Sequence, residues 1–493
     1  MTSAMALFFV VLGYVVLLPS GIFDDNEFMP TPWEEWGIPG DPPAERPLIS
    51  EWFDQSPTWQ EALRLREVSG VAEQQRSLQL ANWHGKVSNL DTVKDAIALI
   101  QARAEAGIEL TRVASDYSLR SLSKPLSDGL SESVVSPILW ITGAFVALCQ
   151  TPQVEVHTGR DVNEWIDYFG EFAASMMPLG DSCFEGSTQM ELSSHRFIET
   201  TLDLLRRGII CDSCSLARTR RSLALVRDRD HEIIGRAAYA EAHRTQAKLD
   251  RYVGPGDVWR NSGKVVRAFQ LEFHFQSMYE LDLMACDQGW SALFDFFDWR
   301  DGKLANWWVA ARIQREKTKA LIDERYRDQV NLLQMPPIKQ LCIHGQIHNG
   351  WREFLDPQPN AIGEMFFWGS VGVGMQRRKK LGTLTAATMV ETTLAIAQWR
   401  EAGGGPGLPA TLDELVPEFL DGLPVDAFNG EPLGYDAARG LLWSVGVDGV
   451  DSGGVREEPF LGLIDELGLG FSSTLDLWHV FQIEPDGEGG DAE

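Results

Sequence analysis

Residues 361–454 contain the stretch that decides the fold. A long run, AIGEMFFWGSVGVGMQRRKKLGTLTAATMVETTLAIAQWR (361–400), comes before LPATLDELVPEFLDGLPVDAFNGEPLGYDAARGLLWSVGVDG (408–449). The first run begins apolar, passes a basic cluster and becomes amphipathic at helical spacing. It therefore predicts one long helix over 361–400, which Gly403-Gly404-Gly405-Pro406 ends.

The second run predicts a short helix followed by a hairpin. Thr411 and Glu414 have the spacing of a capping box, so a helix should begin there and stop near the next proline. The connector after it is rich in turn residues and is tightest at Asn429-Gly430. Gly434–Asp436 and Leu441–Val445 then predict two antiparallel strands, followed by an acidic, glycine-rich loop.

This order of segments resembles the C-terminal half of the major pseudopilins of type II secretion. It is similar as well to a segment of large envelope proteins from several bacterial phyla. The resemblance implies a helix packed on a small antiparallel sheet, with a final loop that binds calcium in that family. By position, the candidate ligands are Ser444, Asp448 and Asp451. Their hard oxygens suit calcium; the alternative is that the two aspartates only shape a glycine-rich turn.

The N-terminus predicts an export or anchoring segment. Residues 4–18, AMALFFVVLGYVVLL, contain no polar group except the Tyr14 hydroxyl. As a helix they span about 22 Å, and continuation to Phe23 approaches the apolar thickness of a bilayer. Residues 1–23 are therefore either a cleaved signal or an uncleaved anchor, with the body on the outer side. A pseudopilin leader is absent, so we expect no polymerisation as a pilus subunit.

The acidic charge lies at the two ends of the chain. The 71 acidic and 43 basic residues give a net charge of −28. Residues 1–60 contribute −8 and residues 401–493 contribute −18, so the span between them is nearly neutral. A chain without a basic footprint is not expected to bind nucleic acid. The acidic, proline-rich residues 24–56 predict an extended tether, and residues 484–493 a disordered tail.

The remaining segments predict a mainly α protein. Residues 57–360 show mostly helical periodicity with no strand run and no fixed repeat, which indicates a large irregular helical domain with a predicted break at Pro137. Residues 361–454 form the small pseudopilin-like α+β module, and residues 455–483 a segment that packs back on the body. Most of the 17 tryptophans fall within helical segments, which favours packing anchors over stacking platforms for sugars.

The cysteine and histidine motifs of the body are weak as catalytic signals. Cys211 and Cys214 have CxxC spacing, for which a structural disulfide or two buried thiols is favoured over thiol redox catalysis. His344 and His348 have helical metal-ligand spacing but lack the glutamate of zinc proteases, which favours surface or packing histidines.

Arginines after the CxxC motif predict a solvated helix face held by i,i+4 pairs with acids, not a nucleic-acid patch. They are Arg218, Arg220, Arg221, Arg227 and Arg229.

These features predict a non-catalytic protein of the bacterial cell envelope. It would be anchored in the inner membrane with a periplasmic body, or secreted to the periplasm. Its expected role is binding or scaffolding of an envelope protein partner, linked to a secretion or pilus-like system. The alternative is an envelope hydrolase or transferase acting on glycan or peptide, with Glu272 and His274 in its aromatic-rich site.

Overall fold

The described part of the chain is mainly helical, as predicted, and has a small three-stranded antiparallel sheet near its C-terminal end. The computed structural model describes residues 28–69, 90–119, 132–151, 154–180, 184–227, 232–252, 315–333, 373–405, 407–446, 449–454 and 474–483. None of the helices in these ranges is both long enough and apolar enough to cross a bilayer. The predicted membrane segment, residues 1–23, lies outside them.

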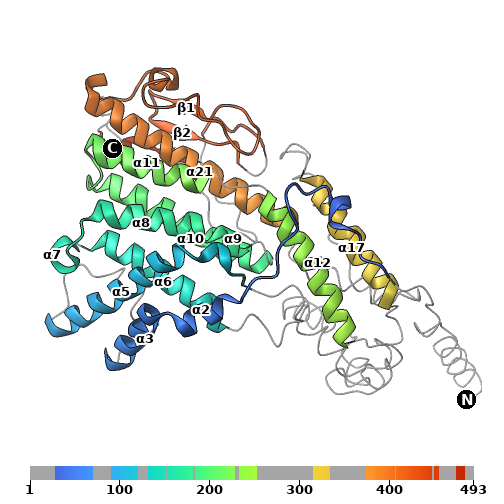
Figure 1. Ribbon diagram of the computed structural model, residues 1–493. Coiled ribbons are helices and arrows are strands. Elements are labelled where there is room, and N and C mark those ends of the chain that lie inside the picture. The colour runs from blue at the N-terminus through green and yellow to red at the C-terminus, as the bar shows by residue number, and fades with distance from the viewer. Residues whose placement is uncertain are drawn as a thin grey trace, which may run out of the picture.

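The helices of the body pack on one another in layers. Figure 1 shows the helices stacked from α3 and α5 at the bottom, through α6, α10 and α8, to α11 and α21 at the top. The helices before α10 are α2 (Ile49–Gln55), α3 (Pro57–Ser69), α5 (Leu90–Thr111), α6 (Glu132–Gln150), α7 (Val154–Thr158), α8 (Val162–Ser175) and α9 (Met177–Gly180). From α10 onward they are α10 (Phe184–Arg206), α11 (Ser213–Arg227), α12 (Glu232–Tyr252), α17 (Arg315–Leu332), α21 (Val373–Trp399) and α22 (Leu477–Phe481).

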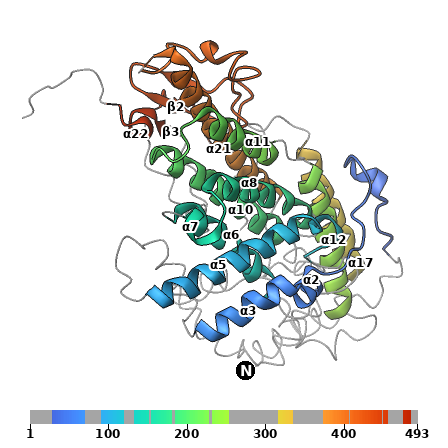
Figure 2. The ribbon, with the colours of Figure 1, turned by 60° about the vertical axis from the view of Figure 1, so that its left-hand side comes forward.

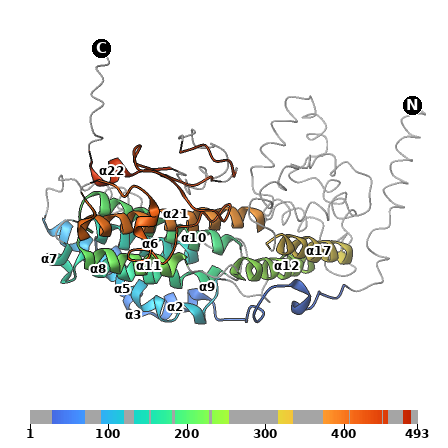
Figure 3. The ribbon, with the colours of Figure 1, turned by 90° about the horizontal axis from the view of Figure 1, so that it is seen from above.

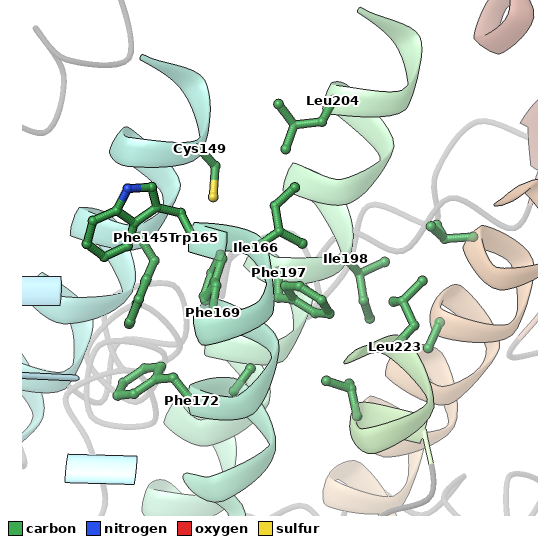
Figure 4. Close-up of a cluster of buried hydrophobic side chains, with 14 of the residues drawn as sticks. Phe145, Cys149, Trp165, Ile166, Phe169, Phe172, Phe197, Ile198, Leu204 and Leu223 are labelled. Carbon is green, nitrogen blue, oxygen red and sulfur yellow. The ribbon is translucent and has the colours of Figure 1, made fainter. Parts of the chain in front are cut away.

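An aromatic cluster fills the space between α6, α8 and α10 (Figure 4). Phe145 stacks on Phe169 with ring centroids 5.3 Å apart, and Phe169 meets the edge of Phe197 at 5.4 Å. The sequence of α8 explains the geometry, because Trp165, Phe169 and Phe172 recur at helical spacing on its buried face. The tryptophan of this set therefore anchors packing, as the sequence favoured.

Pro137 lies inside α6 rather than at a break, which corrects the prediction. It stands near the beginning of the helix, so its missing N–H removes one helical hydrogen bond. The buried side chains of Ile138, Ile141 and Phe145 follow it on the same helix, and their burial offsets that loss.

Residues 28–56, for which the composition predicts an extended tether, contain two short helices and pack apolar side chains on the body. Trp33 and Trp36 begin and end a short 3₁₀ helix, η2 (Trp33–Trp36), and both are buried. Their rings meet the edge of Tyr239 on α12, and the indole of Trp33 donates to the Gly40 carbonyl at 2.9 Å. The proline and acid content of this segment predicts an extended, solvated chain. The two buried tryptophans are what attach it to α12.

The N-terminal segment and two helices make a second apolar cluster. Ile38 packs on α12, and Ile322 and Tyr326 of α17 complete the group. Thr31 donates a hydrogen bond to Asp323 on α17 at 2.5 Å. Figure 3 shows α12 and α17 side by side at one end of the molecule, away from α7.

The long helix α21 is enclosed on nearly all sides. Residues 381–396 are almost all buried, because α10 and α11 pack on α21 together with the C-terminal segments. The hydroxyls of its threonines form hydrogen bonds within the helix. Thr388, Thr392 and Thr393 each donate to the backbone carbonyl four residues earlier. The predicted helix end before the glycines is confirmed; residues 361–372 lie outside the described part.

The sheet has the order β1-β2-β3. Strands β1 (Gly434–Asp436) and β2 (Leu441–Trp443) form the predicted hairpin, and β3 (Thr474–Asp476) pairs antiparallel with β2. Leu442 and Leu475 join the same continuous apolar cluster as the helical body. Within the described residues, the C-terminal part therefore shares one apolar core with the helical body.

Candidate functional site

A hollow of about 670 Å³ opens where three segments distant in sequence end beside one another. Its walls are the end of α10 with the following turn, the end of α21, and α22. In Figure 2, α22, β3 and α21 lie together at one end of the molecule. The lining residues are Leu205, Arg206, Arg207, Gly208, Ile210, Cys211, Ala397, Arg400, Glu401, Gly403, Gly405, Val480, Phe481 and Gln482.

The first wall is built by the C-terminal cap of α10. Gly208 has a left-handed φ of 66°, which a glycine adopts without steric cost. Its N–H donates to the Leu205 carbonyl, and the Ile209 N–H donates to the Leu204 carbonyl, both at 3.0 Å. This double cap turns the chain sharply and leaves Arg206 in the last helical turn, where a cation complements the carbonyl ends.

The second wall is the end of α21. A π-type turn, Arg400–Gly404, contains Gly403 with φ 97°. A Cβ on Gly404 would lie 2.2 Å from the Trp399 ring, so this position has room only for glycine. The glycine run that predicted a helix stop therefore also lets the chain fold tightly against its own tryptophan.

The third wall, α22, is fixed to the other two by polar and aromatic contacts. The Arg400 guanidinium lies 4.8 Å from the centre of the Phe481 ring. The Gln482 side-chain amide donates to the Arg206 carbonyl at 3.1 Å. These contacts hold the three ends as one site, although residues 206, 400 and 482 are far apart in the sequence.

The hollow combines an apolar floor with a basic rim. Leu205, Ile210 and Val480 are buried apolar residues of the floor. Arg206 has a buried Nε without a hydrogen-bond partner among the described residues. Burial also lowers the pKa of the Arg400 guanidinium, since a charged group is less stable away from water.

Carboxylates balance this basic rim only in part. Glu401 is the acidic member of the lining, and its carboxylate accepts the Ser213 hydroxyl at 2.5 Å. Arg207 is 3.4 Å from Asp203 across an exposed i,i+4 pair. The site is thus suited to a ligand that carries negative charge.

Sequence reasoning missed this hollow. The signal was present in the arginines that precede both glycine stops, Arg206-Arg207-Gly208 and Arg400 before the glycine run. Taken locally, each of these motifs predicts only the end of a helix. Nothing in either motif indicates that the two helix ends lie beside one another.

The arginines of α11 correct another prediction. They were expected to form i,i+4 pairs on a solvated face. Instead, Arg220 and Arg227 both pair with Glu391 on α21, and Arg220 donates to Gln398 at 2.7 Å. Arg218 lies 3.4 Å from Asp167 on α8. These three arginines thus pair with neighbouring helices, and two of them hold α21 beside the hollow. Arg221 is exposed, as predicted, and Arg229 lies outside the described residues.

Cys211 and Cys214 are free and exposed, so the prediction of a disulfide or two buried thiols is wrong. Asp212 caps α11 between them, accepting the N–H groups of Cys214 and Ser215 at 3.0 Å. Both thiols therefore lie at the exposed N-terminal end of α11. Cys149, by contrast, is buried, and burial raises the pKa of its thiol.

The predicted calcium loop is described only in part. The buried Ser444 hydroxyl accepts the Gly446 N–H at 2.9 Å. Asp451 accepts the Trp443 indole and the Gly453 N–H, both at 2.8 Å, and these hydrogen bonds lower the pKa of its carboxyl. Asp448 lies outside the described residues. Within the described part, no three His, Cys, Asp or Glu residues are placed to hold a metal.

A carboxylate not singled out from the sequence stabilises this end of the molecule. Asp426 is buried and accepts the backbone N–H groups of Phe428 at 3.0 Å and Val445 at 2.8 Å. The Thr385 hydroxyl of α21 donates to it at 3.4 Å. Asp426 therefore joins the connector, the end of β2 and the long helix.

The remaining sequence candidates lie outside the described residues. They are Glu272, His274, His344 and His348. The predicted capping box at Thr411 and Glu414 is confirmed, at the start of the 3₁₀ helix η6 (Leu412–Leu415). No protein-family model, curated protein or solved structure matches this chain.

Proposed function

We propose that this protein is a non-catalytic component of the bacterial cell envelope, exported or held at the membrane by residues 1–23, that binds another envelope protein. The hollow at the ends of α10, α21 and α22 is the observation that carries the proposal. It joins an apolar floor to a charged rim, as binding sites commonly do. The resemblance of residues 361–454 to pseudopilins supports a link to a secretion or pilus-like system.

The location is tested with a fusion to a reporter that is active only outside the cytoplasm. The full chain should direct the reporter to the periplasm, and removal of residues 1–23 should abolish that activity. Salt and carbonate washing of membranes then separates an anchored chain from a released one. Reporter activity confined to the cytoplasm would contradict the proposed location.

The binding role is tested by cross-linking in living cells. A photo-reactive amino acid at Cys211, which lines the hollow, should capture one discrete protein partner. Val156 on α7 is a matched control, because it is 77% exposed but lies outside the hollow. Identical cross-linking patterns from both positions would count against a specific site.

Calcium binding stays a prediction of the pseudopilin resemblance. Titration of the full chain with calcium in a calorimeter should give heat that Asp448→Ala removes. Asp413→Ala changes an exposed acid outside the loop and is the control. The absence of heat at millimolar calcium would exclude the site.

A thiol oxidoreductase is the second candidate function, favoured by the exposure of both CxxC thiols at the start of α11. In that reaction the two thiols become a disulfide while a partner disulfide is reduced to two thiols. Replacement of both Cys211 and Cys214 by serine should then abolish the cellular function. An unchanged phenotype would remove this candidate.

A further inference from the structure

We propose that the hollow is a binding site for an acidic peptide segment, and that the tail of this chain, residues 484–493, is its occupant. The inference rests on the proposed binding role of the hollow. It adds the chemical class of the ligand and a means by which the chain regulates access to the site.

Charge complementarity is the first argument. Arg206, Arg207 and Arg400 surround the hollow, against one lining carboxylate, that of Glu401. This basic group stands out in a chain whose net charge is −28. The Nε of Arg206 is itself buried without a hydrogen-bond partner among the described residues, so at least part of this positive charge lies away from water.

The tail has the matching chemistry. Its sequence, EPDGEGGDAE, holds five acidic residues and no basic residue. Carboxylates are the preferred partners of arginine, whose planar guanidinium accommodates both oxygens of a carboxylate. The tail has no large apolar side chain, so charge is the chemistry by which the hollow would recognise it.

The position of the tail is the second argument. Gln482 lines the hollow, and the tail begins two residues later. Ten residues reach about 33 Å when extended, which exceeds the distance needed to re-enter a site beside their own origin. A tether this short gives an effective concentration of roughly millimolar, so even a weak site is occupied within the same chain.

The consequence is competition. An acidic segment of a partner must displace the resident tail before it reaches the arginines. Competition between the tail and a second acidic segment is therefore the measurable outcome.

The test compares two full-length proteins. One is wild type; in the other, the five tail acids are replaced by their amides (Glu484→Gln, Asp486→Asn, Glu488→Gln, Asp491→Asn and Glu493→Gln). A fluorescent peptide of sequence EPDGEGGDAE is titrated into each at low salt, and its anisotropy is measured. The neutralised chain should bind the peptide about tenfold more tightly, because its own tail no longer competes. Equal affinities, or no binding by either protein at millimolar concentration, would overturn the inference.

The location is tested in the neutralised chain. Arg206→Ser and Arg400→Ser should each weaken the peptide at least tenfold, whereas Arg196→Ser, on an exposed part of α10, should leave it unchanged. Arg400→Ser also removes the contact with Phe481, which helps to hold α22 in place. Arg207 is exposed, so Arg207→Ser is a third hollow variant that should leave folding unchanged. Tight binding retained by all three hollow variants would place the peptide elsewhere.

The two proposals fail separately. A partner captured at Cys211 without any peptide binding leaves the binding function in place and removes the tail inference. Peptide binding without cellular cross-linking would leave the tail inference in place and remove the proposed binding of a protein partner.

Discussion

The aromatic core of the body and the junction around α21 are both buried, but different physical terms hold them together. Between α6, α8 and α10, Phe145, Phe169 and Phe197 pack ring against ring. Around α21, by contrast, the decisive groups are charged: Glu391 meets two arginines, and Asp426 accepts two backbone N–H groups. Apolar burial supplies most of the stability, whereas directional bonds fix how one element is placed against another.

This difference bears on the hollow. Its walls come from the junction, where Arg220 of α11 holds the end of α21 through Gln398 and Glu401 accepts Ser213. Changes in the aromatic core should therefore lower global stability, while changes at the junction should alter the site at a smaller cost in stability.

The largest effect is expected from Phe169→Ala. The ring is fully buried against Phe145 and Phe197, so its loss leaves a cavity. The free energy of unfolding should fall by about 4 kcal/mol. Chemical denaturation measures it, with the exposed Val156→Ala as the control. A loss below about 1 kcal/mol would show that the core collapses around the gap or is loosely packed.

Asp426→Ala should have the next largest effect. It removes a buried acceptor and leaves the N–H groups of Phe428 and Val445 without their partner, at a cost of about 3 kcal/mol. The exposed Glu418→Ala is the matched control. Amide hydrogen exchange should accelerate near β2 and leave α8 unchanged; uniform acceleration would erase the distinction between the two regions.

Glu391→Gln should cost about 2 kcal/mol, because it removes the nearly buried carboxylate that pairs with both Arg220 and Arg227. Its more specific effect is on the hollow, since α21 loses its charged contacts with α11. In the tail-neutralised chain, Glu391→Gln should weaken peptide binding more than Phe169→Ala does, when both variants are measured at one temperature below their unfolding transitions. The reverse order would contradict the separation of the two regions.

The smallest effect is a gain. Burial raises the pKa of Asp167 to about 6, although Arg218 opposes the shift. A carboxyl with a raised pKa binds more protons in the folded state, so stability increases as pH falls from about 6 toward 4. Asp167→Asn should therefore stabilise the protein at pH 7 by about 1 kcal/mol, after allowance for solvent screening. It should also flatten the pH dependence of unfolding between pH 4 and 6; a steeper dependence would contradict the assignment.

Local sequence signals predicted local structure well. The capping box at Thr411, the end of the long helix before the glycine run and the β1–β2 hairpin all depend on neighbours within a few residues, and all three are confirmed. What the local signals did not predict are contacts between segments that are distant in the sequence. Trp33 and Trp36 contact Tyr239 on α12, and Arg220 and Arg227 of α11 pair with Glu391 on α21.

The sequence by itself determined that the chain is mainly helical, where the long helix α21 ends and where the net charge lies. These properties follow from backbone conformation, hydrophobic period and residue counts, none of which needs a distant partner. Only the tertiary structure decided that Arg227 meets Glu391, 164 residues away, and that the ends of α10, α21 and α22 enclose one hollow. Contacts of this kind depend on how whole helices pack, and no local pattern encodes which two helix ends will meet.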